Sequence, residues 1–382
     1  MASVCVSQRF LGLTENPFSP KGTTAMEDEE LPKNCTLNWT EALPIDYPSE
    51  DFSVKIGVPI TFAVIFIVGL VGNGTLVYIV LKNKSMRTKP NVLIVSLAIG
   101  DFLLILVSVP FTSTMYTFQE WNYGTVVCKL NEFMQTVSLG VSVFTLAALS
   151  ADRFLAIVYP FTAYCSVTMT KVRTIAVSIW AVAVLMGLVD LVGADVRPCC
   201  SSQINVCDLY PPEWGDNYEA FRRVFRFLVY FLFPVVVITT LYSVIACVLY
   251  RKPYDGSQRH SGTGATSAIS RRIESRKRVA KVVLSFVVIF VVCWLPRQFY
   301  ALWYYYAEFE YSTAWHFFKI VGFCLCFIYS SINPFALYFL NDEFRHYFRY
   351  YLFRRCNPKW RLPPTTSRMN SVQSSTVRYS VV

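Results

Sequence analysis

Seven stretches of this chain carry almost no charge over the length that a helix needs to cross a lipid bilayer, about 20 residues. They are separated by polar segments, and together they predict an all-α membrane protein, a seven-transmembrane helix bundle over residues 54–340. A soluble bundle of buried helices is the weaker interpretation, because so many stretches reach spanning length. The stretches are Ile56–Leu81, Val92–Met115, Leu130–Tyr159, Thr174–Val189, Phe227–Tyr250, Lys281–Tyr306 and Trp315–Leu340.

Composition and loop charge agree with this interpretation and indicate an orientation. Charged residues make up 16% of the chain, whereas a soluble domain carries about 25%. The segments after the first and fifth stretches are rich in lysine and arginine, while the N-terminal segment is acidic, as is the loop before the fifth stretch, which carries Asp208, Glu213, Asp216 and Glu219. Because lysine and arginine favour the cytoplasmic side, we expect a multi-pass plasma-membrane protein with its N-terminus outside. The net charge of +10 then reflects loops facing membrane lipid, not nucleic-acid binding.

The segments that flank the bundle carry sites of covalent modification. Residues 1–53 are predicted to be a mostly disordered extracellular segment, with glycosylation sequons at Asn34 and Asn38. Residues 341–356 alternate aromatic with basic side chains and predict a short amphipathic helix on the inner membrane surface. Cys356 at its end is a candidate for palmitoylation, with a free thiol as the alternative. Residues 357–382 form a tail that we expect to be disordered, and its last three residues fit a PDZ-domain ligand.

Cysteines at the predicted extracellular side can form disulfides in an oxidising compartment. Cys128 opens the third stretch and Cys207 lies in the loop before the fifth, so a bond between them would hold that loop over the mouth of the bundle. The neighbouring Cys199 and Cys200 leave the partner of Cys128 open, with Cys207 preferred. No cysteine or histidine spacing resembles a zinc site.

Ionisable groups inside a transmembrane helix are costly and indicate function. Asp101 lies in the middle of the second stretch, and Asn73, Ser142 and Asn333 are polar candidates on other helices. Asp101, Ser142 and Asn333 could bind an allosteric sodium ion. A hydrogen-bonded cluster without metal is the alternative, and no other cofactor is expected.

Prolines interrupt three of the predicted helices. Pro234, Pro296 and Pro334 each remove one backbone hydrogen bond and permit a kink in the fifth, sixth and seventh helix. Kinked helices around a polar centre predict a bundle with more than one arrangement.

With these features in place, the chain resembles the rhodopsin-like (class A) G-protein-coupled receptors over residues 56–356. One recognisable signature falls in each stretch, in the expected order. The signatures are Gly72-Asn73, Leu97-Ala98-x-x-Asp101, Asp152-Arg153-Phe154, Trp180, Pro234 with Tyr242, Phe290-x-x-Cys293-Trp294-Leu295-Pro296 and Asn333-Pro334. Within the family, Asn333-Pro-Phe-Ala-Leu-Tyr338 is similar to the bombesin receptor group and to the insect CCHamide receptors.

The resemblance implies an extracellular peptide ligand and a heterotrimeric G protein, of the calcium-mobilising kind, as partners. It also implies receptor kinases and arrestin acting on the serine and threonine residues of the tail. An activation switch would comprise Asp152, Arg153, Tyr242, Phe290, Trp294, Pro296, Asn333 and Pro334. In it, helix six would pivot at Pro296 and free Arg153.

Other functions fit the sequence less well. Another peptide class, endothelin-like or chemokine-like, is the nearest alternative. A transporter or channel would show inverted repeats or further intramembrane charges, and neither is visible. None of the seven apolar stretches contains a group of residues that could form a catalytic nucleophile site or bind a catalytic metal. We therefore do not expect the protein to be an enzyme.

Two departures from the family pattern concern the switch. The tyrosine expected three residues after Pro334 is replaced by Leu337, with Tyr338 one position later. The start of the sixth stretch carries Arg276, Lys277 and Arg278 without an acid in phase, so we expect Arg153 to pair with Asp152.

The pocket residues implied by the resemblance exclude two ligand classes. Gln135 stands where amine receptors carry an aspartate, and Phe327 stands where opsins carry the retinal lysine. The predicted ligand-binding residues are Gln135, Arg226, Arg297, Gln298, Phe323 and Phe327. The alternative for the two arginines is that Arg226 or Arg297 pairs with Glu308, Glu310 or Glu132 and only stabilises the bundle.

Overall fold

The computed structural model describes residues 52–118, 120–159, 168–198, 205–251, 264–306 and 313–353. The predicted glycosylation sites Asn34 and Asn38, the palmitoylation candidate Cys356, the C-terminal tail, and Cys199 and Cys200 lie outside these ranges.

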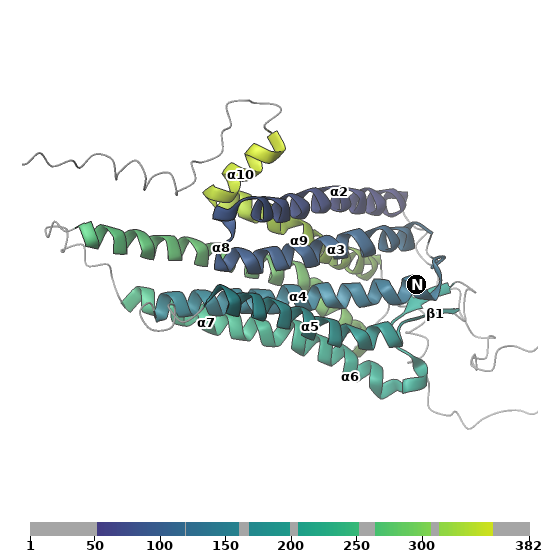
Figure 1. The fold of residues 1–382 in the computed structure, drawn as a ribbon. Coiled ribbons are helices and arrows are strands. Elements are labelled where there is room, and N and C mark those ends of the chain that lie inside the picture. The colour runs from purple at the N-terminus through teal and green to yellow at the C-terminus, as the bar shows by residue number, and fades with distance from the viewer. Residues whose placement is uncertain are drawn as a thin grey trace, which may run out of the picture.

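The described residues form a bundle of seven membrane-length helices that run side by side (Figure 1). This confirms the predicted all-α membrane fold. The first four spans are α2 (Phe52–Lys82), α3 (Lys89–Phe118), α4 (Gly124–Val158) and α5 (Met169–Gly193). The fifth consists of α6 (Asp216–Phe227), a π-helical turn η4 (Leu228–Leu232) and α7 (Phe233–Arg251); α8 (Gly264–Tyr306) and α9 (Thr313–Leu340) complete the set.

Short elements connect the spans at both ends. The hairpin of β1 (Asp195–Pro198) and β2 (Asn205–Asp208) is antiparallel and lies at one end of the bundle (Figure 1). A 3-10 turn, η3 (Pro212–Trp214), leads from it towards α6. At the other end are the 3-10 turn η2 (Lys84–Met86) and the short helix α10 (Asp342–Phe353). All backbone groups of a spanning helix are satisfied within it, which is why only helices cross here.

Small residues let α4 and α5 approach closely. A Cβ added at Gly187 of α5 would lie 2.9 Å from the Val137 side chain of α4, and one added at Gly140 would lie 3.1 Å from Ala183. Lipid tails are as apolar as leucine, so van der Waals contact at small residues is what holds such helices together.

The fifth helix begins earlier than the sequence predicted. We expected Asp216 and Glu219 in a loop and a helix from Phe227, but the helix already begins at Asp216. The ion pair between Glu219 and Arg223, whose charged atoms are 2.6 Å apart, stabilises the added turns. These turns are polar, so a search for apolar stretches does not find them. The π-helical turn precedes Pro234, whose ring would clash with a carbonyl one turn earlier, so the wider turn accommodates the proline.

The predicted eighth helix is present as α10. Asn341 caps its N-terminus, because its side-chain oxygen accepts the backbone N–H of Glu343 at 3.0 Å. Phe344, Tyr347 and Phe348 form a buried stripe in the core cluster they share with α2, α3, α4, α8 and α9. The Tyr347 hydroxyl is also 3.0 Å from the Ser85 hydroxyl of η2. The aromatic face of α10 therefore packs on the bundle.

This packing predicts unequal effects of two substitutions in α10. Phe344→Ala should lower the unfolding free energy by about 3–5 kcal/mol, because a fully buried ring is lost and a cavity remains. Leu352→Ala, at a side chain that is 41% exposed, should change it little. Thermal denaturation of the purified protein measures both, and an equal loss would contradict the packing.

Candidate functional site

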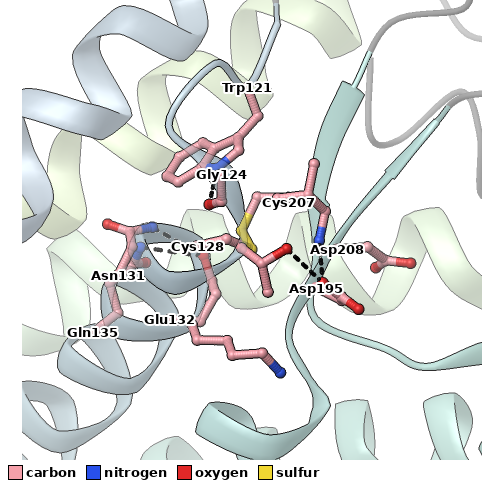
Figure 2. The surroundings of a disulfide bond; sticks show 12 residues. Trp121, Gly124, Cys128, Asn131, Glu132, Gln135, Asp195, Cys207 and Asp208 are labelled. Atoms are coloured by element: carbon pink, nitrogen blue, oxygen red, sulfur yellow. Dashed lines mark hydrogen bonds between the residues drawn. A yellow bond between two sulfur atoms is a disulfide. The ribbon is translucent and has the colours of Figure 1, made fainter.

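A disulfide fixes the hairpin over one end of the bundle. Cys128 at the start of α4 is bonded to Cys207 of β2, with their Cα atoms 5.6 Å apart (Figure 2). Val196 of β1 lies opposite Cys207 in the antiparallel register. Trp121 lies next to this disulfide, and its indole N–H donates to the carbonyl of Gly124 at the start of α4 at 2.9 Å. The predicted pairing of Cys128 is confirmed.

A second attachment joins the hairpin to α4 through Asp195. Its carboxylate accepts the Thr125 hydroxyl at 3.0 Å and the backbone N–H of Val196 at 2.8 Å (Figure 2). Desolvation by itself would raise the pKa of Asp195. These hydrogen bonds, with the charges of Lys129 and Arg197, outweigh it and lower that pKa below its ordinary value.

Beyond the disulfide, α4 carries the polar side chains Asn131, Glu132 and Gln135. The Glu132 carboxylate accepts the side-chain amides of Asn131 at 3.1 Å and of Gln135 at 3.5 Å (Figure 2). Glu132 is within electrostatic range of Arg226 and Arg297. Its position places a buried carboxyl group next to the predicted ligand-binding residue Gln135.

A buried ionic cluster centres on Asp190 of α5, which is 1% exposed. One carboxylate oxygen pairs with Arg222, and the other pairs with Arg226 at 3.1 Å. The Thr136 hydroxyl of α4 donates to the same oxygen as Arg226. The cluster joins α4, α5 and α6, and two arginines on one carboxylate leave local positive charge.

Asp190 was not among the residues predicted from the sequence. The predicted fourth stretch ended at Val189, so an acid at the next position resembled the start of a loop. A signal was present, because the apolar Leu191 and Val192 follow and place Asp190 inside the helix. None of the alternatives for Arg226 named Asp190, with which it pairs among the described residues. Two of the alternative partners, Glu308 and Glu310, lie outside the described residues.

The remaining predicted ligand-binding residues lie on α8 and α9. The guanidinium of Arg297 lies 3.7 Å from the centroid of the Phe323 ring, and Gln298 is half-buried beside it. Phe327 is 3% exposed and packs edge-on against Phe62 of α2, at 5.4 Å between ring centroids. The structure therefore groups Gln135, Arg226 and Arg297 around Glu132, whereas Phe327 belongs to an apolar cluster of α2, α3 and α9.

An aromatic layer lies between these residues and the end of the bundle opposite the hairpin. The ring centroid of Phe290 of α8 lies 6.0 Å from those of both Trp294 and Phe231. The Phe290 ring also packs edge-on against Tyr329 of α9, with 5.5 Å between the ring centroids. These ring contacts couple the fifth span, α8 and α9 at this level.

The intramembrane carboxylate Asp101 lies beneath this layer and is fully buried. It accepts the Asn333 amide at 2.7 Å and the Ser142 hydroxyl at 3.4 Å, so the three residues named for sodium lie together. The side-chain oxygen of Asn333 is buried without a hydrogen-bond partner. Oxygen ligands of this kind suit a hard cation. No group of three or more His, Cys, Asp or Glu residues that could hold a metal occurs in the described ranges.

At the end of the bundle opposite the hairpin, Arg153 is 3% exposed and pairs with Asp152, the partner expected from the sequence. The Tyr242 hydroxyl of α7 donates to the backbone carbonyl of Ala280 on α8 at 3.1 Å. Asn73 of α2 donates to the carbonyl of Ser330 on α9 at 2.8 Å. The signature residues thus tie neighbouring helices to one another.

Comparison with known proteins decides what this bundle is. Residues 72–338 match the family described as "7 transmembrane receptor (rhodopsin family)". The chain belongs to this family. It is a family of multi-pass membrane receptors and not a class of enzymes.

Two relatives of this rhodopsin-family receptor are similar over most of the chain. The neuropeptide CCHamide-1 receptor of Drosophila melanogaster is 44% identical over 78% of the chain. Bombesin receptor subtype-3 of Ovis aries is 37% identical over 81% of the chain. The matched parts cover 60% and 77% of these relatives, so the chain spans less than two thirds of the length of the first.

The receptor departs from its family at the end of α9. Leu337 is 1% exposed and lies in the main apolar core, where the family pattern has a tyrosine. Tyr338 faces α10 instead, and its hydroxyl accepts the Arg349 Nε–H at 3.1 Å. The tyrosine hydroxyl therefore joins α9 to α10, and an apolar side chain, Leu337, occupies the core position.

The lowered pKa of Asp195 predicts how acid affects the hairpin. An acid whose pKa is lowered on folding stabilises the protein above its unfolded pKa, about 3.9, and this stability is lost as the pH falls through the lower folded pKa. Thr125→Val removes one donor, so hairpin stability should be lost at a higher pH than in the native protein. Hydrogen exchange of the β1 and β2 amides between pH 7 and pH 3 measures this, and identical profiles would contradict it.

Proposed function

We propose that this receptor binds an extracellular peptide of the CCHamide or bombesin kind and activates a heterotrimeric G protein that mobilises calcium. The observation that carries the proposal is the charged pocket beneath the Cys128–Cys207 hairpin, with arginines from α6 and α8 and no aspartate at Gln135. The names of the two relatives support a peptide ligand.

The chemistry of the pocket suits a peptide better than an amine. Arginine side chains are donors only, so Arg222, Arg226 and Arg297 recognise carbonyl or carboxylate oxygens, which a peptide supplies along its backbone. An amine ligand needs a buried acid facing it. Asp190 is already paired with two arginines, and Glu132 accepts the Asn131 and Gln135 amides and lies within electrostatic range of Arg226 and Arg297. Both acids are therefore poorly suited to that role.

The aromatic layer provides a route from the pocket to the cytoplasm. A peptide that presses on Trp294 would act on Phe290, which contacts side chains of the fifth span and of α9. Pivoting of α8 at Pro296 would then break the Tyr242 contact with Ala280 and separate Arg153 from Asp152. The cleft that opens would receive the G protein.

Further partners and modifications belong to the same proposal. A sodium ion at Asp101, Ser142 and Asn333 would stabilise the resting bundle, because these residues supply oxygen ligands. We assign glycans to Asn34 and Asn38 on an extracellular N-terminus and a lipid anchor to Cys356. Phosphorylation of the tail by receptor kinases would recruit arrestin, and the last residues would bind a PDZ domain.

Calcium release in transfected cells tests the ligand class. CCHamide-1 or bombesin peptides should release calcium at submicromolar concentration, whereas biogenic amines should not. A response to an amine alone would contradict the proposal.

Arg153→Ala tests the switch in the same cells. It should abolish calcium release while peptide affinity stays within about threefold, because Arg153 lies far below the pocket. Arg173→Ala, at an exposed arginine of α5, is the matched control and should signal normally. Loss of peptide binding in Arg153→Ala would count against the scheme.

A further inference from the structure

The segment of α8 at Pro296, where the proline permits a kink, lies directly against a glycine of α9. A Cβ added at Gly322 would lie 3.3 Å from the backbone nitrogen of Arg297, 3.4 Å from its Cα and 3.5 Å from the carbonyl carbon of Pro296. These are backbone atoms, which cannot rotate away as a side chain can. Gly322 therefore sets how closely α8 and α9 approach at the point where α8 can bend.

The residue after Gly322 makes a second contact with the same segment. The Arg297 guanidinium lies over the Phe323 ring at 3.7 Å from its centroid, within the range of a cation–π interaction. Phe323 packs on the apolar cluster of α2, α3 and α9, so the ring is supported from behind. Arg297 is thus held on α9 through its backbone and through its side chain. We call Gly322, Phe323 and Arg297 the kink clamp.

Aromatic stacking joins α8 and α9 outside the clamp. Trp315 of α9 stacks on Trp303 of α8 at 5.9 Å and on Phe299 at 6.3 Å. The outer ends of the two helices are therefore fixed together, and relative movement is left to the part of α8 on the cytoplasmic side of Pro296.

We propose that the kink clamp holds α8 in its resting position, and that a hydrogen-bond acceptor of the ligand activates the receptor by drawing the Arg297 guanidinium off Phe323. Gly322 and Phe323 are positioning residues that act through Arg297. The inference rests on the proposed receptor function, and it names the ligand group as a carbonyl or carboxylate oxygen, since a guanidinium only donates.

Two observations connect the clamp with the resting state and with the pocket. Arg153 is buried and paired with Asp152, and Tyr242 bonds to Ala280, so the cytoplasmic ends of α7 and α8 are closed in the arrangement where the clamp is formed. Glu132 is within electrostatic range of Arg297, so the pocket already contains an acid that can attract the released guanidinium.

Ligand-independent signalling tests the clamp. Phe323→Leu removes the ring and Gly322→Ala forces the kink away from α9, so each variant should raise basal inositol phosphate production at equal surface expression by about twofold or more. The double variant should not exceed the stronger single variant, because both act through Arg297. Gly57→Ala is the control, since a Cβ there has nothing within 4 Å and basal signalling should stay unchanged.

A direct conformational readout separates the clamp from the identity of the ligand. Spin labels at the exposed Lys82 of α2 and Lys281 of α8 should report a larger fraction of long distances in both clamp variants without any peptide. Unchanged distances and unchanged basal signalling in Phe323→Leu would overturn the clamp. If Gly322→Ala fails to reach the cell surface, the result for Phe323→Leu alone decides the test. Absence of a calcium response to CCHamide-1 or bombesin, with the distance change present, would overturn only the proposed ligand.

Discussion

The outer half of this receptor depends on one buried carboxylate. Asp190 neutralises part of the charge of Arg222 and Arg226 and accepts the Thr136 hydroxyl, so a single side chain ties α4, α5 and α6 together. Charges this deeply buried are costly unless they are paired and hydrogen-bonded. Asp190 gives Arg222 and Arg226 of α6 a fixed acceptor, while the third arginine of α6, Arg223, pairs with Glu219.

The inner half is organised by contacts that can open. The aromatic layer around Phe290 and the hydrogen bond from Tyr242 to Ala280 join α8 to its neighbours, and the Arg153–Asp152 pair lies within α4. None of them is a disulfide or a multiply paired buried charge. The half of the bundle next to the hairpin is thus held by a disulfide and a doubly paired buried carboxylate, and the opposite half by contacts that are easier to break.

The sequence predicted the spans well, because an uncharged apolar stretch of about 20 residues rarely occurs outside a membrane-spanning helix. It also predicted the Cys128–Cys207 bond and the cluster of Asp101 with Ser142 and Asn333. It failed where polar residues continue a helix, as at Asp216, and where an acid lies next to the predicted end of a span, as at Asp190. The Gly322 contact could not be predicted, because which glycine meets a kink depends on how two helices pack in three dimensions.

A double-mutant cycle at Asp190 and Arg226 tests most directly whether this carboxylate organises the pocket. Asp190→Asn alone should cost about 3–5 kcal/mol of stability, because it leaves buried arginines unpaired. When Asp190→Asn is combined with Arg226→Gln, the loss of stability should be smaller than the sum of the two single losses by at least about 1 kcal/mol. The exposed pair Arg197–Glu213, taken through the same cycle by thermal denaturation, should be additive within about 0.5 kcal/mol. Additive losses at Asp190 and Arg226 would contradict the account.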